Sequence, residues 1–366
     1  MADTPRAVCG SERGRLPGRM AQIVGLAVLC GVGAELLAAY AETTGNLGGV
    51  TFSLVFFAAL YGAPALLARE LVRRAGWGWP SLLVIFLALG VTQACLIDQA
   101  MFSIDYQGYE GWEATREATL IPGTGVGAFN LYNFLGGHLI FSFGAPVALA
   151  EAWRPAHRER SWLGPIGIIV ALVAYIVAAV LILADPESHS ASPTQLALSA
   201  LTVLALLTLA ALVGRSHRRN VARTPVEPVE TPRRLAPAEA PPVWVVFVVV
   251  LVLALTAGFA DENWAGVGLG VGATVLTALL VWRLSRGRGW GARHVAAVAV
   301  PFLLVRGSLA FTYFPLAGSV EPVAKYTHNV IMLLIVLLAS WFALRKVTAR
   351  HDPMDRVSRN PTSSIR

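Results

Sequence analysis

The sequence places one arginine, Arg306, in the middle of an apolar stretch, residues 294–314, that is long enough to cross a membrane. A charged side chain at the centre of a bilayer costs about 2.5–3.5 kcal/mol on insertion scales, so it needs a partner or a function there. The partner that the sequence offers is Glu35, the acidic residue deepest inside another apolar stretch. The pair predicts either a site or gate for a polar solute or a static ion pair that fixes the arrangement of helices.

Other polar residues come to a similar depth if each apolar stretch is a helix that rises about 1.5 Å per residue. Measured from the inner edge, Glu35 lies at about 21 Å and Asp98 at about 25 Å. Arg306, Gln93 and His138 each lie at about 18 Å. The sequence therefore predicts a polar cluster just outside the midplane, although equal depth does not show that these helix faces meet.

His138 belongs to a stripe at i, i+4 spacing, which consists of Asn130, Phe134, His138 and Ser142. Such a histidine is either a hydrogen-bonded packing residue or part of a ligand site. No His-Glu-x-x-His or comparable spacing accompanies it, so we predict no metal, no cofactor and no catalytic residue.

The composition indicates that these apolar stretches lie in a lipid bilayer. The chain of 366 residues is 55% hydrophobic and 14% charged, whereas soluble domains are about 25% charged. The fold class expected is all-α, a polytopic integral membrane protein whose main partner is the lipid bilayer. The net charge of +7 does not indicate nucleic acid, because the basic residues lie in short loops between apolar runs. The preference for arginine over lysine, with much Ala, Val and Gly, is typical of bacterial proteins and points to the bacterial cell membrane.

Ten stretches come close to the roughly 20 apolar residues that a membrane span requires. With the N-terminus inside, 26 of the 29 Lys+Arg residues fall in inner segments, and only Arg116 and Lys325 fall in outer ones. Because positive charge marks the cytoplasmic side, we expect both termini inside. The predicted spans are residues 21–41, 51–68, 81–102, 130–150, 163–184, 194–213, 243–260, 265–282, 294–314 and 326–344.

The segments between the spans suggest a division of the chain. We expect a cytoplasmic tail at 1–20, a six-helix half at 21–213, a four-helix half at 243–344 and a disordered tail at 345–366. Residues 214–242 are rich in Pro, Glu and Arg and are typical of a disordered linker. The outer loop at 103–129 is acidic and aromatic, and it is either a solvated loop or a cover over the outer mouth.

Residues 61–70 and the third and fourth predicted spans resemble bacterial multi-spanning proteins that are similar to the CAAX-protease and bacteriocin-processing intramembrane proteases. Phe134 and His138 match that family's Phe-x-x-x-His motif. Where the family has Glu-Glu-x-x-x-Arg, this chain has residues 93–98, without the glutamates or the arginine, and the family's final motif is absent. The resemblance implies a relative that has lost the catalytic acid.

The sequence therefore favours a non-enzymatic multi-pass membrane protein that binds or transports a small solute at the polar cluster. Two alternatives stay open. One is an inactive protein of the intramembrane-protease type, and the other is a structural or accessory membrane subunit held together by Glu35 and Arg306.

Overall fold

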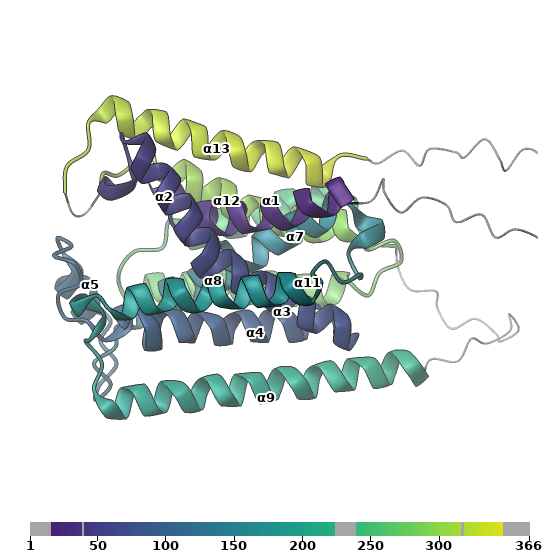
Figure 1. Ribbon diagram of the computed structural model, residues 1–366, viewed down its shortest axis with the longest axis horizontal. Coiled ribbons are helices and arrows are strands. Elements are labelled where there is room, and N and C mark those ends of the chain that lie inside the picture. The colour runs from purple at the N-terminus through teal and green to yellow at the C-terminus, as the bar shows by residue number, and fades with distance from the viewer. Residues whose placement is uncertain (1–15, 39, 224–238, 316–317, 347–366) are drawn as a thin grey trace, which may run out of the picture.

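The computed structural model describes residues 16–38, 40–223, 239–315 and 318–346, and it is a bundle of helices with no strand in these ranges (Figure 1). The predicted all-α class is confirmed. The tail at 1–20 lies mostly outside the described residues, as do most of the linker at 214–242 and of the tail at 345–366. The α-helices are α1 (Leu16–Ala34), α2 (Leu47–Phe57), α3 (Ala63–Ala75), α4 (Trp79–Val91), α5 (Trp112–Ala118), α6 (Ala128–Gly137), α7 (Ala145–Ala152), α8 (Pro165–Leu183), α9 (Pro193–Arg223), α10 (Val243–Gly258), α11 (Trp264–Leu284), α12 (Ala292–Leu309) and α13 (Pro322–Leu344).

Eight helices in the described ranges are long and apolar enough to cross a membrane. Three of them consist of two or more elements joined without a break: Leu47–Ala75, Trp79–Ile97 and Ala128–Ala152. The other five are α8, α9, α11, α12 and α13, and two shorter apolar helices are Gly18–Ala34 and Val243–Gly258. Each predicted span overlaps one of these helices, although the span predicted at 21–41 continues past the end of its helix at Ala34.

α1 lies at the centre of the bundle, where it packs against α2, α3 and α7. α12 packs against α7, α10 and α13. α9 lies along one edge of the bundle beside α4, and α13 lies at the opposite edge (Figure 1). α8 buries only Ala171 and Ala178, and its remaining surface is apolar, as expected of a helix that faces lipid.

Three long helices contain a π-helical segment: η4 (Ala58–Gly62), η5 (Thr92–Ile97) and η7 (His138–Gly144). In two of these segments the last residue is a glycine that begins the same tripeptide, Gly-Ala-Pro, at residues 62–64 and 144–146. A proline has no N–H to donate and its ring pushes away the carbonyl four residues earlier. The repeated tripeptide therefore explains why the helical hydrogen bonding is irregular at the same place in both helices.

Glycine lets α1 approach both segments closely. A Cβ atom on Gly62 would lie 2.6 Å from the Cα of Ala27, and one on Gly33 would lie 2.4 Å from the carbonyl oxygen of Phe141. Neither distance is possible for a real side chain, so only glycine fits at these two contacts.

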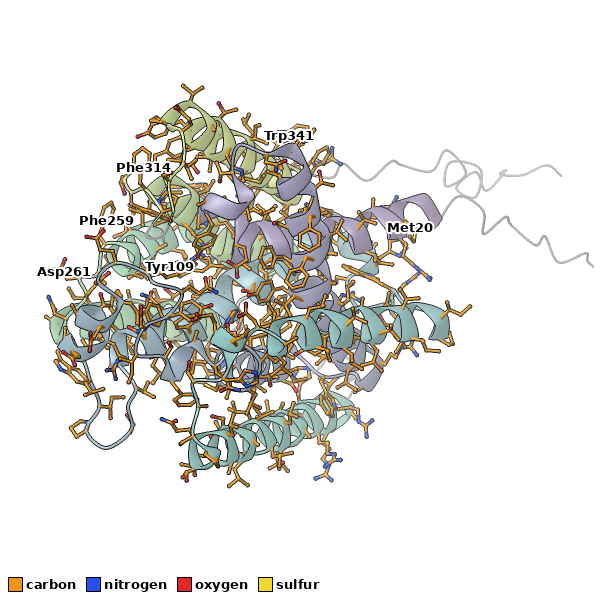
Figure 2. The ribbon with its side chains drawn as sticks, turned by 60° about the vertical axis from the view of Figure 1, so that its left-hand side comes forward. Met20, Tyr109, Phe259, Asp261, Phe314 and Trp341 are labelled. Carbon is orange, nitrogen blue, oxygen red and sulfur yellow. The ribbon has the colours of Figure 1, made fainter. Side chains whose placement is uncertain are left out.

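The two ends of the bundle carry different residues. Phe259, Asp261 and Phe314 lie at one end and Met20 at the other (Figure 2). We call these the Phe314 end and the Met20 end. α9 extends past the predicted span to Arg223, and a Cβ on Gly214 would collide with the Trp77 ring, so the helix stays packed beyond residue 213.

Candidate functional site

α1 ends inside the bundle, at Ala34, although the sequence stays apolar on both sides of Glu35. Glu35 occupies the turn that follows, before the short 3-10 helix η2 (Leu36–Ala38). In a continuous helix the carbonyl of Ala34 would accept from the N–H of Ala38, but that N–H donates instead to the backbone carbonyl oxygen of Glu35, over 3.0 Å. The break leaves the carbonyl oxygen of Ala34 without a partner from its own helix.

Side chains from two other helices satisfy the carbonyls at this break. Arg306, in the last turn of α12, donates from Nη2 to the carbonyl oxygen of Ala34 over 2.8 Å. His328 of α13 hydrogen-bonds through Nε2 to the carbonyl oxygen of Leu36 over 2.7 Å. A cation suits this position because a helix C-terminus carries partial negative charge.

The carboxylate of Glu35 contacts a tyrosine. Its Oε1 accepts a hydrogen bond of 2.7 Å from the hydroxyl of Tyr61, which lies in η4. No ion pair within 4.0 Å joins Glu35 to Arg306 in the part of the chain that the structure describes. Arg306 contacts the residue next to Glu35, but its guanidinium faces the Ala34 carbonyl and the Phe141 ring, 4.7 Å from Cζ to the ring centroid. Glu35 and Arg306 therefore lie near each other but do not form the direct ion pair that the sequence predicts.

His138 lies on the other side of Tyr61. Its ring centroid is 5.5 Å from that of Tyr61, and its Nδ1 is 3.1 Å from the hydroxyl of Ser142 within the same π segment. Its Nε2 is buried and has no hydrogen-bond partner among the described residues. The predicted stripe therefore brings His138 and Ser142 into contact at the irregular part of the helix.

The remaining two candidates attach to this group in different ways. Gln93 of η5 donates from Nε2 to the carbonyl oxygen of Leu60 over 3.2 Å. Pro64, four residues further along the chain, has no N–H to donate to that carbonyl. Asp98 follows η5, and its Oδ1 accepts from the N–H of Ala100 over 3.0 Å. Gln93 therefore supports the segment that holds Tyr61, while Asp98 caps a local turn.

We call Glu35, Tyr61, His138, Ser142 and Arg306 the central polar cluster. Three of these residues were predicted as candidates and are brought together here. Tyr61 was not, although the Gly-Ala-Pro tripeptide that follows it and recurs after Phe143 is a signal in the sequence.

Aromatic side chains from the Phe314 end approach the cluster. Burial raises the pKa of Tyr106 above its ordinary value, and the nearby carboxyl groups of Asp98 and Glu35 raise it further. The ring of Tyr106 packs on that of Trp112, with 5.0 Å between centroids. The loop at 103–129 thus lies against the start of α6, on which its short helix α5 packs.

The cluster contains few metal-ligating groups. Within the described ranges there is no set of three or more His, Cys, Asp or Glu side chains that could hold a metal ion. Phe134, the first residue of the Phe-x-x-x-His stretch, packs on Trp112 with 5.9 Å between ring centroids.

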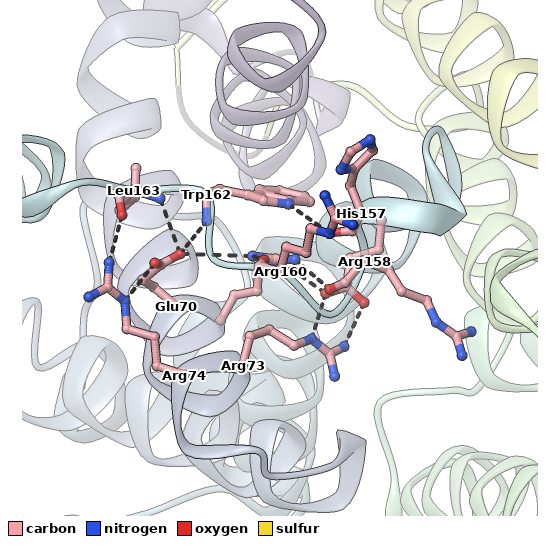
Figure 3. Close-up of polar contacts among 10 residues, drawn as sticks. Glu70, Arg73, Arg74, His157, Arg158, Arg160, Trp162 and Leu163 are labelled. Carbon is pink, nitrogen blue, oxygen red and sulfur yellow. Dashed lines mark hydrogen bonds and ion pairs between the residues drawn. The ribbon is translucent and has the colours of Figure 1, made fainter. Parts of the chain in front are cut away.

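A second polar network lies at the Met20 end, where α3 and α7 meet the segment 153–164 (Figure 3). Glu151 of α7 accepts from Arg69 Nε over 3.0 Å, from Arg73 Nε over 2.8 Å and from Arg73 Nη2 over 2.6 Å. The Arg69 side chain is completely buried, lies 3.5 Å over the Trp162 ring, and donates to the carbonyls of Arg158 and Arg160.

Glu70 completes this network. One carboxylate oxygen accepts from Arg74 Nε over 2.7 Å, and the other accepts from the N–H groups of Trp162 and Leu163 over 2.8 and 3.2 Å (Figure 3). The network ties the segment 153–164 to the end of α3. From the sequence alone these arginines are interpreted as topology signals, so their ion pairs with Glu70 and Glu151 are not predicted.

Comparison with known proteins gives no match to any family model, to any curated protein or to any solved structure.

Proposed function

We propose that this chain is a bacterial cell-membrane protein with ten spans and both termini inside, which binds a small polar solute at the central polar cluster and carries it across the bilayer. The eight long apolar helices and the two shorter ones, α1 and α10, support the count of spans. The distribution of Lys and Arg supports the orientation, which makes the Phe314 end the outer one.

The observation that carries the proposal is the break in α1 at Glu35. Backbone that is not helical is tolerated at membrane depth only where protein buries it or where it lines a cavity. Transporters commonly bind solutes and ions at such discontinuous helices, near the midplane. Here the broken end of α1 faces π segments η4 and η7, and π segments occur frequently at functional sites.

Unused hydrogen-bonding atoms give further support. His138 Nε2, Arg306 Nε and Gln93 Oε1 are buried and have no partner among the described residues. Each buried polar group that lacks a partner costs about 1–3 kcal/mol. A bound polar solute would supply partners for several of these atoms at once.

The test is a screen of small polar solutes for thermal stabilisation of the purified full chain, followed by uptake of each hit into vesicles that contain it. The variant is Glu35→Gln. The matched control is Gln22→Met, which removes a buried polar group on the same helix, where Gln22 Nε2 donates to the Ala150 carbonyl over 2.9 Å. We expect solutes that stabilise the wild type and Gln22→Met but not Glu35→Gln. A screen without such a solute would refute the proposal.

The second candidate is a structural or accessory subunit, and the contacts of Arg306 and His328 with the α1 backbone favour it. In that case these side chains serve to hold three helices together. Arg306→Lys would then reduce the amount of folded protein, and no solute would depend on Glu35.

A further inference from the structure

The two opposite charges of the central polar cluster are each left without a countercharge in contact. Glu35 Oε1 accepts from Tyr61, and no donor to Oε2 is found among the described residues. Arg306 uses Nη2 on a backbone carbonyl, and its Nε is buried without a partner. Charged groups inside membrane proteins are normally paired with one another or with polar partners. A site that holds one carboxylate and one guanidinium, near each other and not joined, is therefore unusual.

Charge balance restricts what this site can bind. A simple cation on Glu35 would leave Arg306 without a countercharge, and a simple anion on Arg306 would leave Glu35 without one. A net-neutral molecule with both charges would satisfy each of them. The separation required is short, because Arg306 contacts Ala34, the residue next to Glu35.

His138 adds a second, independent indication. It is 8% exposed, its Nδ1 lies against Ser142, and its Nε2 has no partner among the described residues. It contributes a polar atom on the Tyr61 side of the cluster. Apolar contact comes from Phe141, whose ring lies beside the Arg306 guanidinium. The cluster thus offers a carboxylate, a guanidinium, a further polar atom and an aromatic surface.

From these contacts we infer that the solute is a small zwitterion of amino-acid size, with its ammonium group on Glu35 and its carboxylate on Arg306. This inference rests on the proposed function and specifies the class of solute for the same site. Tyr61 would position the Glu35 carboxylate by its hydrogen bond, and Phe141 would keep the guanidinium in place.

The experiment measures binding of a matched series to the purified full chain in nanodiscs by calorimetry. L-alanine, β-alanine and γ-aminobutyrate carry both charges at increasing separation. L-alaninamide keeps only the ammonium group and N-acetyl-L-alanine keeps only the carboxylate. We expect at least one zwitterion to bind, and the two capped forms of alanine to bind at least about tenfold more weakly than the best zwitterion, because each loses a charged contact.

The Glu35→Gln variant assigns the contact. It should lower the affinity for the zwitterion by about tenfold or more and leave that for N-acetyl-L-alanine unchanged, while Gln22→Met should change neither. Equal affinity for L-alanine and L-alaninamide would overturn the inference, and so would the absence of binding by all three zwitterions. If a solute with one charge or none binds in a way that depends on Glu35, the proposed function stands and the zwitterion is wrong. If no solute shows that dependence, both are wrong.

Discussion

The ion network at the Met20 end gives a quantitative prediction for Glu151→Gln. This change keeps the shape of the side chain but removes its charge. The carboxylate accepts three hydrogen bonds from Arg69 and Arg73, and both arginines are more than nine-tenths buried. Removing one partner of a buried ion pair leaves an uncompensated charge and costs about 3–5 kcal/mol.

Two other substitutions provide a scale. Glu70 pairs with Arg74, whose side chain is 46% exposed, so Glu70→Gln leaves a charge that water can reach. The amide oxygen of the new Gln can still accept from the N–H groups of Trp162 and Leu163. The expected cost is about 1–2 kcal/mol. Glu159→Gln breaks a pair with Arg158 on the surface, where the glutamate is 73% exposed, and its expected cost is between zero and about 1 kcal/mol.

The assay is thermal unfolding of the three purified variants in the same detergent. With about 2 °C per kcal/mol for a chain of this size, Glu151→Gln should unfold about 6–10 °C below the wild type, and Glu159→Gln within about 2 °C of it. We expect the unfolding midpoint to be lowest for Glu151→Gln, higher for Glu70→Gln and highest for Glu159→Gln. Equal midpoints for Glu151→Gln and Glu159→Gln would show that the network does not stabilise the fold.

Three further predictions concern the helix contacts. Gly62→Ala should reduce the yield of folded protein and lower its unfolding midpoint by several degrees, because a Cβ there meets the α1 backbone at Ala27. Gly268 has open space around it, so Gly268→Ala should be neutral or slightly stabilising in the same assay. Equal effects of the two changes would contradict the close approach of α1. Lys325→Met should cost less than about 1 kcal/mol in thermal unfolding, because no ion pair of Lys325 is found in the described ranges. The Ala310 carbonyl, which accepts from Lys325, also accepts from Asn329 and so keeps a donor. A loss as large as that of Glu151→Gln would point to an essential charge. Ser81→Ala removes the hydrogen bond of 2.6 Å to the Ala210 carbonyl that joins α4 to α9, and it should cost about 1 kcal/mol; an unchanged midpoint would mean that apolar packing alone holds α9.

Hydropathy predicts the helices well because the requirement is simple: a span needs about 20 apolar residues. Each of the ten predicted spans overlaps a helix, and eight of these helices are long and apolar enough to cross a membrane. The end of α1 at Ala34 could not be predicted in this way, since Leu36 and Leu37 continue the apolar run on the far side of Glu35. The carbonyls at the break are satisfied by Arg306 and His328, which come from distant parts of the chain.

Depth placed Glu35, His138 and Arg306 at one level, and in the structure Glu35 and His138 both contact Tyr61 while Arg306 contacts Ala34, the residue before Glu35. Depth alone does not show which way a side chain points, so the direct pair of Glu35 with Arg306 could not be checked from the sequence. The ion network could have been suspected from the repeated Gly-Ala-Pro, because Arg69 and Glu151 follow the two prolines at the same spacing. They also pair with each other.

Cysteine labelling tests whether Glu35 lies in a polar site that small solutes can reach. Glu35→Cys would be made in a background in which Cys9, Cys30 and Cys95 are replaced, and it would be treated from outside intact cells with a small charged thiol reagent. Leu172→Cys on α8, whose native side chain is 46% exposed on the apolar surface of the bundle, serves as the lipid-facing control. We predict labelling at Glu35→Cys and none at Leu172→Cys. If Glu35→Cys is as unreactive as the control in a protein that folds normally, the break in α1 is only a packing feature and the proposed site does not exist.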